Sequence, residues 1–180
     1  IPVREAVQRG RARASAFTRK HENLGPQPAP GAKLYMDFAG LLIASYPHGF
    51  VCYSGIVDAG SGYGRLFPGF GMTALLATAT LGLFIYDVSG KMGLSQEYKP
   101  ETVRSDQGSA FISHSFREFL TSRQIAQSLS AVYTPQQNSH IERFWGIVFG
   151  TARVLLAAAN LPPTFHPFAL QTAAYIANRL

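Results

Sequence analysis

Three acidic residues stand at places where carboxylates could do metal chemistry. Asp37 lies in the run KLYMDFAG, Asp106 follows the β-prone run ETVRS, and Glu142 lies one turn into a long helical pattern. If the two strands that carry Asp37 and Asp106 are neighbours, their carboxylates meet at one edge of a sheet. Hard divalent cations prefer oxygen ligands, so acids gathered at such an edge could hold a metal ion.

Taken singly, each acid has a simpler explanation. Asp106 could be a turn residue before Gln-Gly, Asp37 a strand-end cap, and Glu142 an acid favoured by the dipole of the first helical turn. The set is more informative than its members, because 35 residues (107–141) separate Asp106 from Glu142. Asp58 is a fourth candidate at the end of another strand, and a structural hydrogen bond is its simpler explanation.

The pattern of apolar residues predicts a mixed α/β fold. We expect strands at 33–40, 49–60, 64–70, 101–106 and 127–135, and helices at 72–88, 113–124, 139–159 and 165–180. Two glycine-rich turns join the first three strands, as hairpins require. The expected architecture is a five-stranded sheet, a three-strand antiparallel meander plus two further strands, flanked by helices.

The predicted helices differ in their apolar faces. Phe116, Phe119 and Leu120 share one face of the helix at 113–124. The helix at 139–159 has a single stripe formed by Ile141, Trp145, Val148, Ala152 and Leu155. The helix at 72–88 is apolar nearly all round, so we expect it to be buried on most sides.

Composition and charge indicate a folded domain preceded by a basic arm. The chain has 180 residues, 47% hydrophobic and 14% charged, which is enough for one globular core. Residues 1–20 contain six Lys and Arg residues and one acid, Glu5. This segment therefore carries most of the chain's formal net charge of +6. We expect residues 1–32 to be a flexible arm and linker, and 33–180 to be the folded core. Arg9, Arg11 and Arg13 suggest a polyanionic partner, unless the arm is merely solvated.

Other features narrow the class of protein. One cysteine, Cys52, excludes an internal disulfide and lies in a run typical of a buried strand. The longest apolar run, 74–86, is shorter than the roughly 20 residues needed to span a bilayer, so we expect no membrane association. No secretory signal pattern is visible, and we expect the chain to be a fragment of a longer polyprotein.

The motifs around Glu142 resemble those of a known family. YTPQQN, then Glu142-Arg143, then the tail from Ala152 to Leu180 are similar to copia-type LTR retrotransposon integrases, over about residues 33–180. These belong with retroviral integrases in the DDE polynucleotidyl transferase superfamily. The resemblance implies a ribonuclease H-like fold and assigns Asp37, Asp106 and Glu142 to the three catalytic, metal-binding positions.

The resemblance also implies an activity. Such enzymes process the 3′ ends of element DNA and join them to target DNA, using two Mg²⁺ or Mn²⁺ ions. Two ions about 3.5–4 Å apart can stabilise both the attacking and the leaving oxygen. Asp37 or Asp106 would bridge the ions and Glu142 would hold one of them.

Partners follow from the same resemblance. We expect DNA contacts from Gln136, Gln137, Asn138 and Arg143, with Gln107 and Ser109 as weaker candidates. We also expect at least a dimer, and action in the nucleus. Retroviral relatives place lysines one and two turns after the glutamate, where this chain has Gly146 and Phe149, so that mode of phosphate contact is in doubt.

Alternatives remain open at this point. The chain could be a decayed or domesticated copy that acts only as a DNA-binding module, or a ribonuclease H-like nuclease or DDE transposase. His114 and His140 lack a metal-binding spacing, which favours solvated histidines over a zinc site.

Overall fold

The computed structural model describes residues 28–40, 42–91, 98–130 and 138–179. Its elements, in chain order, are β1 (Lys33–Ala39), β2 (Cys52–Asp58), β3 (Gly64–Gly69), α2 (Ala74–Lys91), β4 (Thr102–Ser105), α3 (His114–Ser122), β5 (Ala126–Leu129), α4 (Ser139–Ala158), the 3₁₀ turn η2 (Pro163–Phe165) and α5 (His166–Ala177). The last predicted helix therefore begins with a separate short turn.

The five strands form one mixed sheet with the order β3-β2-β1-β4-β5. β1 pairs antiparallel with β2, and β2 pairs antiparallel with β3. On its other side β1 is parallel to β4, which is in turn parallel to β5. The predicted meander plus two strands is confirmed, and β1 and β4 are neighbours. Several boundaries differ from those predicted: β2 and β5 are shorter, and α2 runs to Lys91. Asp37 lies within β1 and not at its end, because Phe38 and Ala39 still pair with β2.

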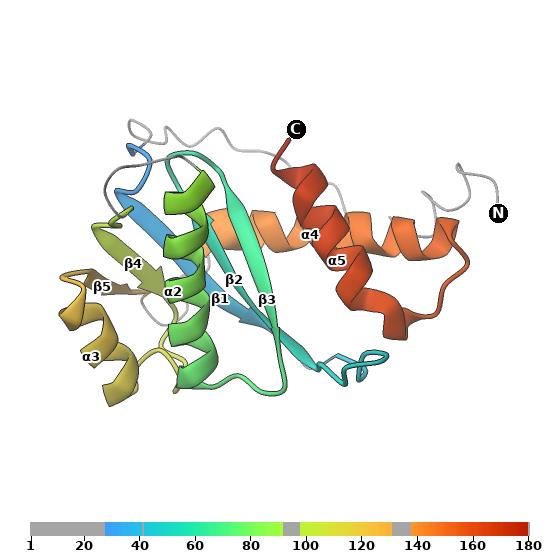
Figure 1. The fold of residues 1–180 in the computed structure, drawn as a ribbon, viewed down its shortest axis with the longest axis horizontal. Coiled ribbons are helices and arrows are strands. Elements are labelled where there is room, and N and C mark those ends of the chain that lie inside the picture. The colour runs from blue at the N-terminus through green and yellow to red at the C-terminus, as the bar shows by residue number, and fades with distance from the viewer. Residues whose placement is uncertain (1–27, 41, 92–97, 131–137, 180) are drawn as a thin grey trace.

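Helices cover both faces of the sheet (Figure 1). α2 and α3 pack on one face, around a core that includes Leu34, Met36 and Phe116. α4 lies across the other face and packs against α5, around a second core that includes Tyr35 and Ile141. Alternate residues of β1 therefore enter opposite cores, as the strand pleat requires.

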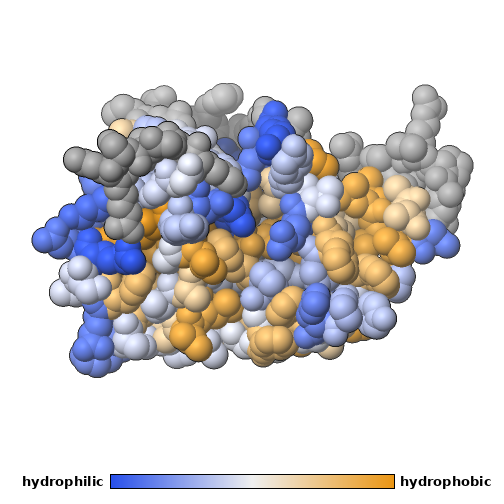
Figure 2. Space-filling view, viewed as in Figure 1, coloured by the Kyte–Doolittle hydropathy of each residue, from blue (hydrophilic) through white to orange (hydrophobic). Residues whose placement is uncertain are grey.

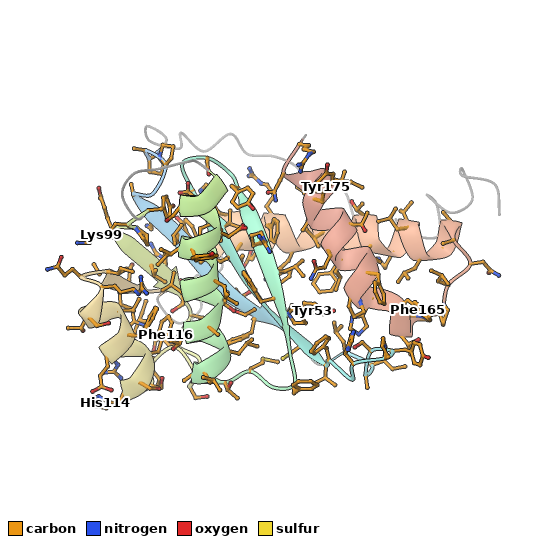
Figure 3. The ribbon with its side chains drawn as sticks, viewed as in Figure 1. Tyr53, Lys99, His114, Phe116, Phe165 and Tyr175 are labelled. Atoms are coloured by element: carbon orange, nitrogen blue, oxygen red, sulfur yellow. The ribbon has the colours of Figure 1, made fainter. Side chains whose placement is uncertain are left out.

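The apolar faces predicted for α3 and α4 pack against the two cores. The Ser113 side chain accepts a hydrogen bond from the Phe116 backbone N–H and so caps α3. Phe116 points from α3 towards the core (Figure 3), where Leu120 is also buried. Four members of the predicted α4 stripe are buried, and Leu155 packs at the margin of the same core.

The burial predicted for α2 is wrong on its outer face. Leu75 and Tyr86 are each 79% exposed and Leu83 is 52% exposed, whereas Leu81 and Phe84 are fully buried. The sheet can cover only one side of a helix, and nothing in the described ranges packs on the other. Figure 2 shows apolar surface on this side of the molecule, over the region of α2 and α5.

A buried polar link fixes α5 to the sheet. His166 Nε2 lies 2.9 Å from the Ile43 carbonyl oxygen, and His166 Nδ1 lies 2.8 Å from the Tyr53 hydroxyl. A carbonyl can only accept, so Nε2 carries the proton and Nδ1 accepts from Tyr53. Tyr53 lies between the sheet and the start of α5 (Figure 3). Cys52, next to it, is buried as predicted.

Among the described helices, none has the length and continuous apolarity required to cross a lipid bilayer.

Candidate active site

Asp37 lies on the face of β1 that α4 covers. It is in register with Gly55 on β2, and the indole ring of Trp145 lies directly over that glycine. A Cβ at position 55 would collide with the ring, so the missing side chain lets Trp145 approach the strand. Asp37 is therefore held in a partly buried position between the sheet and α4.

Burial changes the acidity of Asp37. Desolvation raises its pKa to about 6, and the negative charges of Asp106 and Glu142 act in the same direction. A hydrogen bond of 2.8 Å from the Phe38 backbone N–H to Oδ1 opposes the shift. The pKa of an isolated aspartate is about 3.9, so this carboxyl is unusually easy to protonate. The other two acids are near enough for Asp37 to sense their charges.

The Trp145 indole also lowers the pKa of Asp37, although less strongly than burial raises it. Its Nε1 is buried and makes no hydrogen bond of acceptable geometry within the described residues. The indole therefore acts on the carboxylate without a hydrogen bond of ordinary distance and angle. It nevertheless favours the ionised form of Asp37.

Asp106 follows β4 directly and is exposed. Its Oδ1 accepts a 2.9 Å hydrogen bond from the Gly108 backbone N–H, which closes a tight turn. The Gln107 side chain donates to the Ser130 carbonyl oxygen at 3.2 Å and links this turn to the end of β5. The turn explanation of Asp106 is thus correct, yet it leaves carboxylate lone pairs available at the sheet edge beside β1.

Glu142 lies in the first turn of α4 and is exposed. Its neighbours Ile141, Phe144 and Trp145 are buried, so α4 is anchored on the side adjacent to Glu142. Residues three apart are neighbours on a helix, so Glu142 and Trp145 lie on the same side of α4. Glu142 and the indole over Gly55 are thereby placed by one rigid element.

Asp106 and Glu142 lie within electrostatic range of Asp37, but the three side chains do not enclose a preformed metal site. Across the described ranges, no three His, Cys, Asp or Glu side chains are close enough to hold a metal ion as they stand. The donor set nevertheless fits a hard divalent cation, since all three are carboxylates and Asp37 is within electrostatic range of both others. Neighbouring carboxylates repel one another unless a cation is present.

The residues predicted to contact DNA lie in different surroundings, and some of them are outside the described ranges. Gln136, Gln137, Arg9, Arg11 and Arg13 lie outside the described residues. Arg143 is exposed on α4 and Ser109 is exposed after Asp106. Asn138 is only 8% exposed, at the start of α4, and its side chain does not cap the helix.

Asp58 has the structural role that was expected. It is 3% exposed and its Oδ1 accepts from the backbone N–H groups of Gly31 and Gly60. Its Oδ2 accepts from the backbone N–H and the hydroxyl of Ser61. These bonds tie the segment before β1 to the β2–β3 turn.

The histidines differ from one another. His114 is exposed, and its Nε2 lies 3.2 Å from Glu118 Oε1. His140 is half-buried and stacks on Tyr35, with 4.8 Å between ring centroids. The expectation of a solvated side chain is therefore wrong for His140, because β1 places an aromatic ring beneath it.

Two neighbours of Asp37 were not identified from the sequence. Trp145 was assigned only to the apolar stripe, and Gly55 was not singled out. The three-residue spacing from Glu142 was the available signal for Trp145. Gly55 could not be found in this way, because its role depends on pairing with Asp37 across two strands.

A family model and several relatives match this sequence. The model for the integrase core domain matches residues 27–135. The Pro-Pol polyprotein of feline foamy virus is 34% identical over 114 residues, which is 63% of this chain and 9% of that protein. A retrovirus-related Pol polyprotein from a transposon of Nicotiana tabacum is 36% identical over 81 residues, 45% of this chain and 6% of that protein. The chain thus spans less than a tenth of these curated relatives.

Solved structures have the same fold. The catalytic core domain of HTLV-2 integrase, in complex with magnesium and in a dimeric form, aligns with a TM-score of 0.59 and 23% identity, covering 83% of this chain and 88% of that one. A chain of the simian T-cell lymphotropic virus intasome, in complex with a PP2A regulatory subunit, aligns with a TM-score of 0.64 and 20% identity. The alignment covers 87% of this chain and 54% of that one. The ribonuclease H-like sheet with its flanking helices is therefore confirmed.

Proposed function

Because this chain belongs to the integrase core domain family, we propose that it catalyses DNA integration by polynucleotidyl transfer. The specific steps are 3′-end processing of element DNA and transfer of the new 3′-hydroxyl into target DNA. One observation carries the proposal: Asp37, Asp106 and Glu142 come from three separate elements, and Asp37 senses the charges of both others. Carboxylates this near to one another repel unless a cation is present, which supports a metal site.

The three acids would hold two Mg²⁺ or Mn²⁺ ions. Asp37 on β1 and Asp106, directly after the neighbouring parallel strand β4, would share an ion, and Glu142 would hold one of the ions from the first turn of α4. Bound there, the ions would supply Lewis-acid stabilisation of the attacking and leaving oxygens of a phosphodiester. The HTLV-2 integrase core was solved with magnesium, which supports this choice of ion.

The surroundings of Asp37 determine how readily the site is loaded. Burial favours the protonated carboxyl, whereas a metal ligand must be ionised. The Trp145 indole and the Phe38 N–H both favour the ionised form, so they oppose the cost of burial. We therefore expect metal binding to release a proton from Asp37 near pH 6 and to weaken below it.

The subtype within the family is a finer proposal. YTPQQN and Glu142-Arg143 support a copia-type element, and relatives from plant transposons are consistent with it. The alternative is a decayed or domesticated copy that binds DNA without chemistry. The absence of a ready-made metal cluster among the described acids is the observation in its favour. The family match makes a ribonuclease H or a bacterial-type transposase the weaker alternatives.

We propose that the protein acts as at least a dimer, on DNA and in the nucleus. The outer face of α2 exposes Leu75, Leu83 and Tyr86, an apolar stripe of the kind that a partner usually covers. The HTLV-2 integrase core has been solved in dimeric and trimeric forms. Self-association would remove this stripe from water.

A disintegration assay tests the proposed chemistry. The chain is incubated with a branched DNA that mimics the product of strand transfer, in Mn²⁺, and the resolved strands are separated on a denaturing gel. Wild type should cleave and rejoin the branch, and Asp106→Asn and Glu142→Gln should each abolish the reaction. Glu118→Gln, which removes an exposed acid from α3, is the matched control and should retain activity.

Activity in Asp106→Asn and Glu142→Gln would refute the assignment of these acids. A folded wild-type chain that binds Mn²⁺ and DNA but never resolves the branch would support the DNA-binding alternative.

A further inference from the structure

We propose that a DNA strand bound at the acids continues over a basic strip on the adjacent face of β1 and β4. The basic strip is formed by Lys33, Arg104, His140 and Arg143 around the ring of Tyr35. This inference rests on the proposed function, since it names where the substrate of the same site lies. It assigns phosphate contacts to residues of the sheet and of the first turns of α4.

The strand pleat places the strip next to the acids. Lys33, Tyr35 and Asp37 alternate along β1, so they face the same side of the sheet at intervals of about 6.6–6.8 Å. Arg104 on β4 is the register partner of Tyr35, and parallel partners project to the same side. A path that leaves Asp37 towards the start of β1 therefore passes Tyr35 and Arg104 and reaches Lys33.

Aromatic contacts with Tyr35 hold Lys33 and His140 in position. The Lys33 ammonium lies 5.3 Å from the centroid of the Tyr35 ring. His140 stacks on the same ring, with an interplanar angle of 24°. Arg143 lies three residues further along α4, on the neighbouring turn. Arg104 Nε lies 3.4 Å from the Ser130 hydroxyl, which orients its side chain from β5. The strip therefore joins β1, β4 and α4.

Like charges are concentrated here. Burial lowers the pKa of Lys33, and Arg104 lowers it further. Within the described part of the chain, neither Lys33 nor Arg143 forms an ion pair with a carboxylate. An anion placed between them would relieve this repulsion.

The shape of the strip favours a nucleic-acid backbone. Its cations are spread along a line that begins at the acids, where a phosphodiester must lie if it is to be cut. A phosphodiester chain offers anions at regular intervals along such a line, and basic side chains bind them irrespective of base sequence. The next cation of α4 after Arg143 is Arg153, about 15 Å along the helix. The charges near the acids therefore direct the strand along β1 rather than along α4.

Salt-dependent DNA binding tests the basic strip. The probe is a fluorescein-labelled duplex with a recessed 3′ end, measured by anisotropy with the full chain in EDTA, so that no catalysis occurs. The variants are Lys33→Gln and Arg143→Gln. Lys99→Gln is the matched control, because Lys99 is exposed and bonded to Gln124 rather than to the strip. Thermal melts confirm that each variant is folded.

Loss of one phosphate contact lowers the slope of log K against log salt by about 0.9. For Lys33→Gln, Kd should therefore rise at low salt, and the ratio of variant to wild-type Kd should fall about 3.5-fold between 50 and 200 mM salt. Arg143→Gln should behave in the same way. Lys33→Arg keeps the positive charge, so its slope of log K against log salt should equal that of wild type.

The inference is overturned if Lys33→Gln and Arg143→Gln match Lys99→Gln at every salt concentration, or if wild type does not bind the duplex. This outcome is distinct from failure of the proposed function. Loss of catalysis with an intact salt effect would refute the chemistry but leave the basic strip in place. Normal branch resolution with no salt effect would leave the chemistry and refute the strip.

Discussion

Asp37 should destabilise the metal-free protein at neutral pH, and Asp37→Asn should remove this penalty. The folded pKa of about 6 exceeds the model value of 3.8, so the folded state binds more protons than the unfolded state between these two pH values. Stability must then fall as pH rises through this window. Asparagine has nearly the same shape and no charge to desolvate, and its oxygen can still accept from the Phe38 N–H.

The size of the effect follows from linkage. A shift from 3.8 to about 6 is a penalty of about 3 kcal/mol at pH 7.5 and about 1 kcal/mol at pH 4.5. Solvent screening of the part of the side chain that stays exposed makes these values upper limits. Asp37→Asn should therefore be more stable than wild type at pH 7.5, by up to about 3 kcal/mol, and the two should converge towards pH 4.5.

Urea unfolding in EDTA at pH 4.5, 6 and 7.5 measures this difference. Glu118→Gln is the control, because Glu118 is exposed and is not among the groups that shift the pKa of Asp37. Adding Mg²⁺ at pH 7.5 should stabilise wild type more than Asp37→Asn and so narrow the gap. A gap that is the same at pH 4.5 and 7.5, or a variant that is less stable at pH 7.5, would refute the assignment of the raised pKa to burial of Asp37.

Three further predictions concern other parts of the molecule. Gly55→Ala should lower the free energy of unfolding by about 1–3 kcal/mol in chemical denaturation, because the new Cβ collides with Trp145. Gly62→Ala is the control, because position 62 is open and the substitution adds only the cost of a positive φ. Deleting residues 1–30 should weaken DNA binding and flatten its salt dependence, and an unchanged slope would mean that the basic arm is only solvated. Leu83→Glu, on the exposed face of α2, should lower the mass found by light scattering at high concentration without lowering the melting temperature. A wild type that is monomeric at every concentration would contradict self-association through this face.

Much of the architecture could be predicted from the sequence, because it depends on local periodicity. The apolar stripe of α4 and the shared apolar face of α3 are repeating patterns that a helix satisfies and a strand does not. The spacing from Asp106 to Glu142 predicted that these acids belong to one site, and their role as metal ligands stays a prediction. Helix 72–88 shows the limit of this reasoning. Its composition predicted burial on most sides, but composition does not say whether a second covering element exists within the chain.

The sequence by itself determined which chemical groups are present, on which elements, and in what order along the chain. Only the tertiary structure decided how they act on one another. The raised pKa of Asp37 comes from its burial where β1 pairs with β2 and α4 covers the sheet, and the sequence does not show this pairing. The basic strip requires Arg104 beside Tyr35, on a strand 69 positions away in the chain. Burial and electrostatic attraction depend on distance in space, and strand pairing sets that distance independently of separation along the chain.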